Sequence, residues 1–309
     1  MIASQLATLE FWEAVFGTGV RLAVPLALAA LGELIGERAG VLNLGVGGTM
    51  AAGALAGVAG GAAAGPTIGL VAGTTAGGVA GLLFALIVVR WRANEIIVGF
   101  GFALGGLALA SFLYRGVYEQ RPSISPHQAI SLPLLSDIPV LGPVFFEQPP
   151  LVWLMPIVAG TIAFILTRTR IGLEVRAVGD GPEAAHAKGI AVERTRTLAL
   201  AAAGGLAGLG GAVLSVGLVG EYSDEIVGGR GFVALALVIA ASWRPWLLVA
   251  LCLVVGSLQG FQLRAQSLDA NLPVELLQAL PFVVTLIVLA FGVGSGRAPR
   301  ALGRLTRAA

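Results

Sequence analysis

Long apolar stretches separated by short polar segments dominate this sequence and restrict the folds that it can form. A helix that crosses a bilayer needs about 20 mostly apolar residues, and nine stretches meet or approach this requirement. They cover residues 14–35, 41–62, 66–89, 95–114, 150–168, 196–219, 231–243, 246–263 and 273–293. The seventh is short, as expected of a helix that is tilted or broken at the glycines before it. Because the runs are continuous rather than alternating, they favour helices over a barrel.

The composition supports the same class. Apolar residues make up 57% of the 309 residues and charged residues only 12%, and the mean hydropathy is +0.90. A soluble domain of this size exposes far more charge. We therefore expect an all-α, polytopic integral membrane protein of about nine transmembrane helices, folded as a single domain over residues 1–309 and placed in the plasma (inner) membrane.

The basic residues predict the orientation. If residues 176–196 are cytoplasmic, the positive-inside rule places 14 of the 19 basic residues on the inside. These are Arg38, Arg90, Arg92, Arg168, Arg170, Arg176, Lys188, Arg194, Arg196, Arg244, Arg297, Arg300, Arg304 and Arg307. The N-terminus is then outside, and the basic tail 294–309 is cytoplasmic. The longest extracytoplasmic connection is 115–149, whose prolines exclude a continuous helix.

Glycine recurs at every fourth position from residue 53 to residue 81. This glycine series, which consists of residues 53, 57, 61, 65, 69, 73, 77 and 81, runs through a predicted turn at Gly65–Pro66 and so serves two helices. At this spacing glycines line one helix face and allow another backbone to approach closely. We expect close packing, with flexible backbone at a substrate site as the alternative. Residues 201–217 are glycine-rich in the same way.

Several kinds of chemistry are missing from the sequence. Only two histidines and one cysteine are present, and neither a GxxxxGK[ST] phosphate loop nor a GxGxxG motif occurs. The single cysteine, Cys252, lies in an apolar run and is expected to be a small buried residue. We expect no cofactor, no metal, no catalytic residues and no nucleic-acid partner in this chain. If transport is driven by ATP, another chain supplies the ATPase.

The polar segment "RAVGDGPEAAHAKGIAVERTR" (176–196) contains the only lysine of the chain. Pro182 suits the first turn of a helix, and Glu183 beside it complements the helix dipole. Ala184 and Ala185 favour a helix, and Gly189 is suited to ending one. The sequence therefore predicts a short exposed helix inside a cytoplasmic loop that covers residues 169–196. An ordinary connector is the alternative.

The stretch "PEAAHAKG" (182–189) resembles the EAA-x-x-x-G coupling segment of ATP-binding-cassette importer permeases, although the more distal I-x-L-P of the broader motif is absent. In that family the segment docks into a cleft on the ATPase subunit. The resemblance implies an ATPase-coupling role for Pro182, Glu183, Ala184, Ala185, Gly189 and Ile190.

Further stretches resemble the permease branch that serves simple sugars, nucleosides and branched-chain amino acids. They are "TRTRIGLEVRAVGDGPEAAHAKGI" (167–190), "GELIGERAGVLNLGVGGTM" (32–50), "NEIIVGF" (94–100) and "GRGFVALALVIAASWRPW" (229–246). The nucleoside-type permeases are the most similar, but their pattern usually carries glutamate where this chain has Gly47. The departure weakens the nucleoside assignment.

Polar residues at membrane depth are candidates for a substrate pathway. We select Asn43, Glu95, Arg230, its neighbour Phe232, and the amides Gln259 and Gln262. Each polar candidate has a structural alternative. Asn43, Gln259 and Gln262 are equally suited to hydrogen bonds between helices, Glu95 to an interfacial ion pair with Arg90 and Arg92, and Arg230 to snorkelling.

The resemblance implies a permease subunit of an ATP-driven importer that translocates a nucleoside or a simple sugar. Its implied partners are an ATP-binding-cassette ATPase, a second identical or related permease subunit, an extracytoplasmic substrate-binding protein and membrane lipid. One alternative is a branched-chain amino acid permease of the same family. The other is a secondary transporter or channel, which would normally show carboxylates inside its spans, where this sequence has few.

Overall fold

The computed structural model describes residues 8–118, 122–131, 136, 138, 142–266, 274–291 and 298–303. Within these ranges the chain is almost entirely helical, which confirms the all-α class. In order the elements are α2 (Leu9–Arg38), α3 (Val46–Ala64), α4 (Pro66–Ala85), η1 (Leu86–Arg90), α5 (Glu95–Val117), β1 (Ile130–Ser131), η2 (Gly142–Phe146), β2 (Glu147–Gln148), η3 (Pro150–Trp153), α6 (Leu154–Arg168), α7 (Arg170–Asp180), α8 (Pro182–Ala187), α9 (Val192–Ala212), η4 (Val213–Val219), α10 (Arg230–Ala240), α11 (Pro245–Gln266) and α12 (Val274–Phe291).

Seven helices in the described ranges are long and apolar enough to cross a membrane. The remaining two expected spans, 231–243 and 273–293, correspond to the shorter apolar helix α10 and to residues 277–290 of α12. Helix α10 is short because Gly228 and Gly229 precede it with positive φ angles of 51° and 74°, a conformation that interrupts a helix. The count of nine spans stays a prediction.

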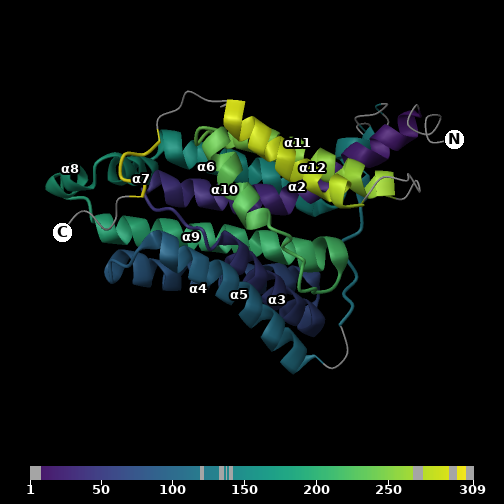
Figure 1. The fold of residues 1–309 in the computed structure, drawn as a ribbon, viewed down its shortest axis with the longest axis horizontal. Helices are drawn as coiled ribbons and strands as arrows, with labels where there is room; N and C mark the ends of the chain where they lie inside the picture. Colours follow the sequence, from purple (N-terminus) through teal and green to yellow (C-terminus); the bar gives the residue numbers. More distant parts are fainter. Residues whose placement is uncertain are drawn as a thin grey trace.

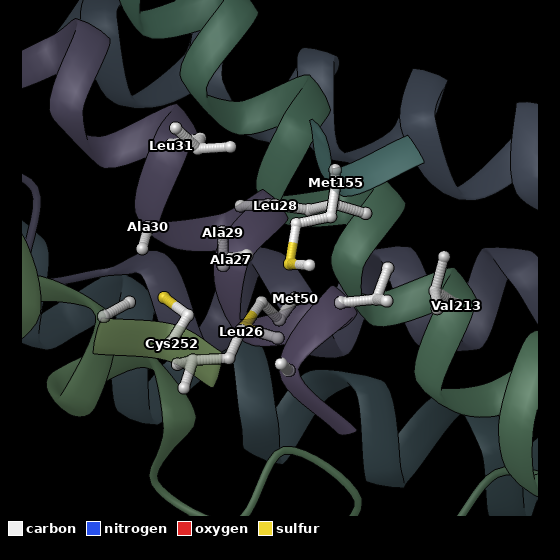
Figure 2. Packing of buried hydrophobic residues seen from close by; sticks show 14 of the residues in the cluster. Leu26, Ala27, Leu28, Ala29, Ala30, Leu31, Met50, Met155, Val213 and Cys252 are labelled. Carbon is white, nitrogen blue, oxygen red and sulfur yellow. The ribbon is translucent and has the colours of Figure 1, made fainter. Parts of the chain in front are cut away.

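Helix α2 lies at the centre of the bundle (Figure 1) and supplies most of its core. Every residue from Leu26 to Leu31 is fully buried. In Figure 2, Met50 of α3, Met155 of α6, Val213 of η4 and Cys252 of α11 lie around this stretch. The side chain of Cys252 is buried and its thiol is free, so the expectation of a small core residue is confirmed.

The glycine series packs two helices against each other and against a third. Its members belong to α3 and α4, and Gly65 forms the turn between them with φ +89°. A Cβ at Gly53, Gly77 or Gly81 would lie closer than 3.0 Å to the backbone of α9. Because the backbone at these positions is helical, the structure favours close packing over unwound backbone. The partner residues include Gly204 and Gly208 of the glycine-rich 201–217 stretch.

The second span begins later than the sequence predicts. Residues 39–45 are not helical, and α3 starts at Val46 rather than near residue 41. Gly40 has φ +81°, which ends the preceding helix. The break places a short stretch of irregular backbone inside the bundle, which we call the 39–45 connection.

The 169–196 segment contains more helix than predicted. The helix expected at Pro182 is present as α8, but α7 precedes it and α9 already begins at Val192. Thr169 caps α7, because its hydroxyl accepts a hydrogen bond from Gly172 N at 3.2 Å. The expected cytoplasmic loop is therefore a pair of helices and two short turns.

The 115–149 connection contains little helix in its described part, as its prolines predict. Helix α5 runs into it as far as Val117, and the five-residue η2 lies near its end. β1 pairs antiparallel with β2, with Ile130 opposite Gln148. Ile124 N donates to Gly220 O at 2.8 Å, which fastens this connection to the segment after η4.

Segments that the charge distribution assigns to the inside meet at one end of the bundle. The end of α2 packs against Gly179 of α7, and Ala301 N of the C-terminal segment donates to Gly179 O at 2.9 Å. Arg38 Nη2 donates to Trp243 O at 2.9 Å. Helix α8 projects from this end, and the start of α2 lies at the opposite end (Figure 1). The arrangement agrees with the predicted sides, although which end faces the cytoplasm stays a prediction.

Candidate functional site

Helix α8 presents an exposed face on a short, well-defined turn of chain. Pro182 occupies its first turn, and Ala185 is buried at 4% exposure while Glu183 and Ala184 are exposed. Gly189 has φ +82°, and Ile190 N donates back to Ala185 O at 3.1 Å. These features match the start and the stop predicted for this helix. One side of α8 is therefore anchored and the other is open to a partner.

A groove of about 1080 Å³ lies beside α8. It is lined by residues of α8, by the turn before α5, by the start of α9 and by the C-terminal segment. Its charged lining residues are Arg92, Asp180, Glu183, Glu193, Arg194, Arg196 and Arg300. The groove combines mixed charge with apolar wall, a surface suited to receiving a protein element.

Two buried carboxylates hold the 39–45 connection. Asn43 N donates to Glu33 Oε1 at 2.9 Å, and Leu42 N donates to Glu95 Oε2 at 3.0 Å. Asn43 itself caps the next turn, because its Oδ1 accepts from Gly45 N at 2.8 Å. Glu33, Asn43 and Glu95 are all less than 5% exposed. The irregular backbone therefore faces side-chain oxygens rather than a cavity.

A second buried carboxylate of α2, Glu37, is bound to the turn after α10. Trp243 Nε1 donates to Glu37 Oε2 at 2.5 Å. Ser242 and Trp243 both have positive φ angles, 51° and 57°, a conformation that is unfavourable for side chains of this size and is held by its surroundings. Nearby, Arg196 Nε donates to Ala39 O at 3.2 Å. The ends of α2, α9 and α10 are thus joined by polar contacts in an apolar bundle.

The first turns of α3 and α10 touch. A Cβ at Gly231 would lie closer than 3.0 Å to the backbone of Gly47, whereas a Cβ at Gly47 would meet Gly231 Cα at 3.9 Å, an ordinary contact. Only glycine fits at 231, but position 47 has room for the start of a side chain. The N-termini of α3 and α10, which carry the positive ends of the two helix dipoles, therefore meet at this junction.

The structure separates the six predicted pathway residues into two that hold the 39–45 connection and four that lie on α10 and α11. Asn43 and Glu95 both hold the 39–45 connection. Arg230 Nη2 donates to Gln259 Oε1 at 3.3 Å, while Nη1 donates to Ile226 O and Val227 O. Phe232 is half-exposed, and its ring centroid lies 6.3 Å from that of Phe100. Gln262 is partly exposed one helical turn from Gln259 on α11.

Two structural alternatives for these residues are wrong. Among the described residues the only salt bridge is Arg115–Asp224, so Glu95 does not pair with Arg90 or Arg92 there. Arg230 is held by Gln259 and by two carbonyl groups rather than extended to the headgroups. For Gln259 a hydrogen bond between helices is confirmed, because its partner Arg230 belongs to α10. The side chain of Asn43 instead accepts a local hydrogen bond from Gly45 N, so the bond between helices expected for it stays a prediction.

Sequence reasoning missed Glu33, Glu37, Arg196 and Trp243. The spans hold more buried acid than expected, since Glu33 and Glu37 are 1% and 0% exposed inside α2. A signal was present in "GELIGERAG", where two acids lie four residues apart in a chain with very few charges. They were missed because acidic residues at the end of an apolar run usually lie at the membrane interface, and because the sequence does not reveal the residues that bind them.

The fold and site define a polytopic helical membrane protein with an exposed helix at one end, and comparison with known proteins supplies its family. Residues 15–289 match the family described as "Branched-chain amino acid transport system / permease component". The chain belongs to this family of permease components. No solved structure gives a significant match.

Individual relatives are similar over nearly their whole length. A putative glucose ABC transporter permease protein of Haloferax volcanii is 33% identical over 92% of this chain and 93% of its own. A nucleoside ABC transporter permease protein of Lactococcus lactis is 33% identical, covering 90% and 92%. A guanosine ABC transporter permease protein of Bacillus subtilis is 30% identical, covering 91% and 92%.

Proposed function

We propose that this chain is the permease subunit of an ATP-driven importer for nucleosides or simple sugars. The observation that carries the proposal is α8, whose exposed face borders a large groove at the end of a membrane bundle. The similarity to glucose, nucleoside and guanosine permeases supports the substrate class and disfavours both a branched-chain amino acid and a secondary transporter. The buried carboxylates of Glu33, Glu37 and Glu95 are not evidence for a secondary transporter, because each already accepts a hydrogen bond from the protein.

In this proposal ATP is hydrolysed by a separate ATP-binding-cassette ATPase that docks at α8. Pro182, Glu183, Ala184, Ala185, Gly189 and Ile190 form and present the coupling helix. Two permease subunits pair, and an extracytoplasmic binding protein delivers the substrate. ATP binding stabilises one arrangement of the pair over the other, which is how a ligand of one subunit shifts the state of another. The chain itself needs no cofactor.

We place the substrate pathway next to the junction between α3 and α10. Arg230 and Gln259 offer donors and an acceptor for hydroxyl or ring-nitrogen groups. Phe232 and Phe100 offer aromatic faces on which a base or a sugar ring packs. Asn43 and Glu95 do not contact the substrate in this proposal but hold the 39–45 connection that leads into α3. Gln262, one helical turn from Gln259, adds a second amide on α11. Without a carboxylate at Gly47, recognition relies on these neutral and cationic groups.

The proposal predicts ATP-dependent uptake by the complete complex. Proteoliposomes that contain this chain, the ATPase and the second permease should accumulate radiolabelled guanosine or glucose when binding protein and ATP are supplied. The chain purified alone should hydrolyse no ATP, because it lacks a phosphate-binding loop. Uptake by the chain alone under an ion gradient would instead assign it to secondary transport.

The orientation is tested by labelling single cysteines from one side. Five expected spans separate Leu9 from Lys188, and both side chains are exposed. In a Cys252→Ala background, Leu9→Cys should react with an impermeant maleimide in intact cells, and Lys188→Cys only after permeabilisation. Reaction of both from the outside would contradict the predicted orientation.

A further inference from the structure

The 39–45 connection is held by acids that come from two different spans. Glu33 belongs to α2 and binds Asn43 N, whereas Glu95 opens α5 and binds Leu42 N. Successive backbone N–H groups are thus fixed by side chains that approach from separate helices. Hydrogen bonds to a carboxylate are about twice as strong as those between neutral groups. The connection is therefore clamped rather than merely packed.

Burying acids in order to hold two N–H groups is an unfavourable arrangement by itself. Charged groups lose hydration free energy when they leave water, and backbone donors are usually satisfied by carbonyl groups or neutral side chains. Glu33 Oε2 is buried without a hydrogen-bond partner, so part of this acid is not even compensated. Such a pair of acids therefore fixes the position of the connection more than it adds to overall stability.

The clamped connection joins the end of the bundle that carries α8 to the candidate pathway. On one side, Ala39 O accepts from Arg196 of α9, and Gly179 of α7 packs against Arg38 O. On the other side the connection leads directly into α3, whose Gly47 touches Gly231 at the start of α10. Arg230 and Phe232 flank that glycine.

We propose that Glu33 and Glu95 are positioning residues that transmit motion from the α7–α8 end to the junction between α3 and α10. By tying the 39–45 connection to α2 and α5, they make the connection move as one piece. A displacement at Gly179 then shifts the first turn of α3 against α10 instead of being absorbed by loose backbone. The inference rests on the proposed function. It requires a hydrogen-bond acceptor at both positions and does not require a charge.

The test compares Glu33→Gln and Glu95→Gln with Glu33→Leu and Glu95→Leu in the complete reconstituted complex. Glutamine keeps a side-chain oxygen that accepts from the backbone, and leucine removes it. The readouts are maximal uptake per transporter, the half-saturating substrate concentration, and the ATP hydrolysed per substrate moved. Ser215→Ala is the matched control, because it removes another buried hydrogen bond between segments, the one to Ala54 O at 2.9 Å.

The leucine variants should lower maximal uptake about tenfold, as expected when a buried backbone donor is left without an acceptor. Their half-saturating concentration should stay parental, and the ATP hydrolysed per substrate moved should rise. The glutamine variants should stay within about twofold of the parent, since their acceptor is retained. Ser215→Ala should keep the parental ratio of ATP hydrolysed to substrate moved even if its Tm is lower. A purely structural loss lowers uptake and hydrolysis together.

Two results would overturn the inference. One is a glutamine variant as defective as its leucine counterpart, which would mean that charge is needed. The other is a leucine variant with the parental ratio of ATP to substrate. If the leucine variants do not accumulate, Glu33→Asp and Glu95→Asp decide, because a side chain shorter by one methylene keeps the charge but does not reach the backbone donor. A raised ratio of ATP to substrate then supports the inference, and a parental ratio contradicts it. Failure of the proposed function is distinguishable, since the parent complex would then show no ATP-dependent uptake.

Discussion

Gly77→Ala should destabilise the membrane domain, whereas Gly78→Ala should leave its stability unchanged or slightly higher. A Cβ at Gly77 would lie closer than 3.0 Å to backbone atoms of Gly204 and Gly208, while a Cβ at Gly78 meets Ala201 O at 3.8 Å. Overpacking costs about 1–3 kcal/mol, and against backbone the upper part of that range applies. Alanine in place of a helical glycine contributes about 0.5–1 kcal/mol of stability. Gly77→Ala should therefore lower the free energy of unfolding, and Gly78→Ala should not.

The measurement is the thermal unfolding of both variants and the parent in the same detergent. A loss of 1 kcal/mol lowers the apparent Tm by about 2–4 °C in a chain of this order of size. Gly77→Ala should also reduce the amount of folded protein recovered from membranes. Equal melting of the two variants would show that the approach of α4 to α9 is looser than the structure has it.

Gly189→Val should abolish most uptake without unfolding the bundle. Gly189 has φ +82° and nothing within 4 Å of an added Cβ, so the substitution meets no clash, only backbone strain. That strain is about 1–3 kcal/mol for a β-branched residue, and it acts where Ile190 N donates back to Ala185 O. We expect the end of α8 to rearrange and the proposed contact with the ATPase to be lost.

Gly189→Asn is the matched control, because asparagine tolerates this conformation far better than valine. It should retain parental uptake and parental co-purification of the ATPase. Glu183→Arg tests the same helix at its start, where reversing the charge costs only about 0.3–1 kcal/mol of helix stability but changes the exposed face. Normal uptake and ATPase retention in both Gly189→Val and Glu183→Arg would mean that the segment is an ordinary connector.

Most of the fold could be predicted from the sequence because apolar runs and glycine positions act locally. The end of the fifth span at Arg168, the turn at Gly65 and the start of α8 at Pro182 were all predicted. The 39–45 connection was not, since "VLNL" is apolar enough to continue a helix. Its break is decided by Gly40 at positive φ and by carboxylates that only the tertiary structure brings near.

The candidate site was harder to predict for the same reason. Trp243 lies 206 positions from Glu37, and Gln259 lies 29 positions from Arg230. No local spacing encodes such pairs. Sequence reasoning found single polar residues inside the membrane but not their partners, and so it could not separate residues that face a pathway from residues that hold backbone in place.

The central position of α2 has a consequence for how the protein is made. This helix is synthesised long before α11, yet its buried face is completed by α11, where Gly256 and Gly260 pack against Gly19 and Val15. Until α11 has been synthesised and inserted, the native neighbours of that face do not exist, and lipid or the insertion machinery must occupy their place. Assembly of the bundle is therefore a late event in biogenesis, and chains truncated before residue 245 should be substrates for membrane quality control.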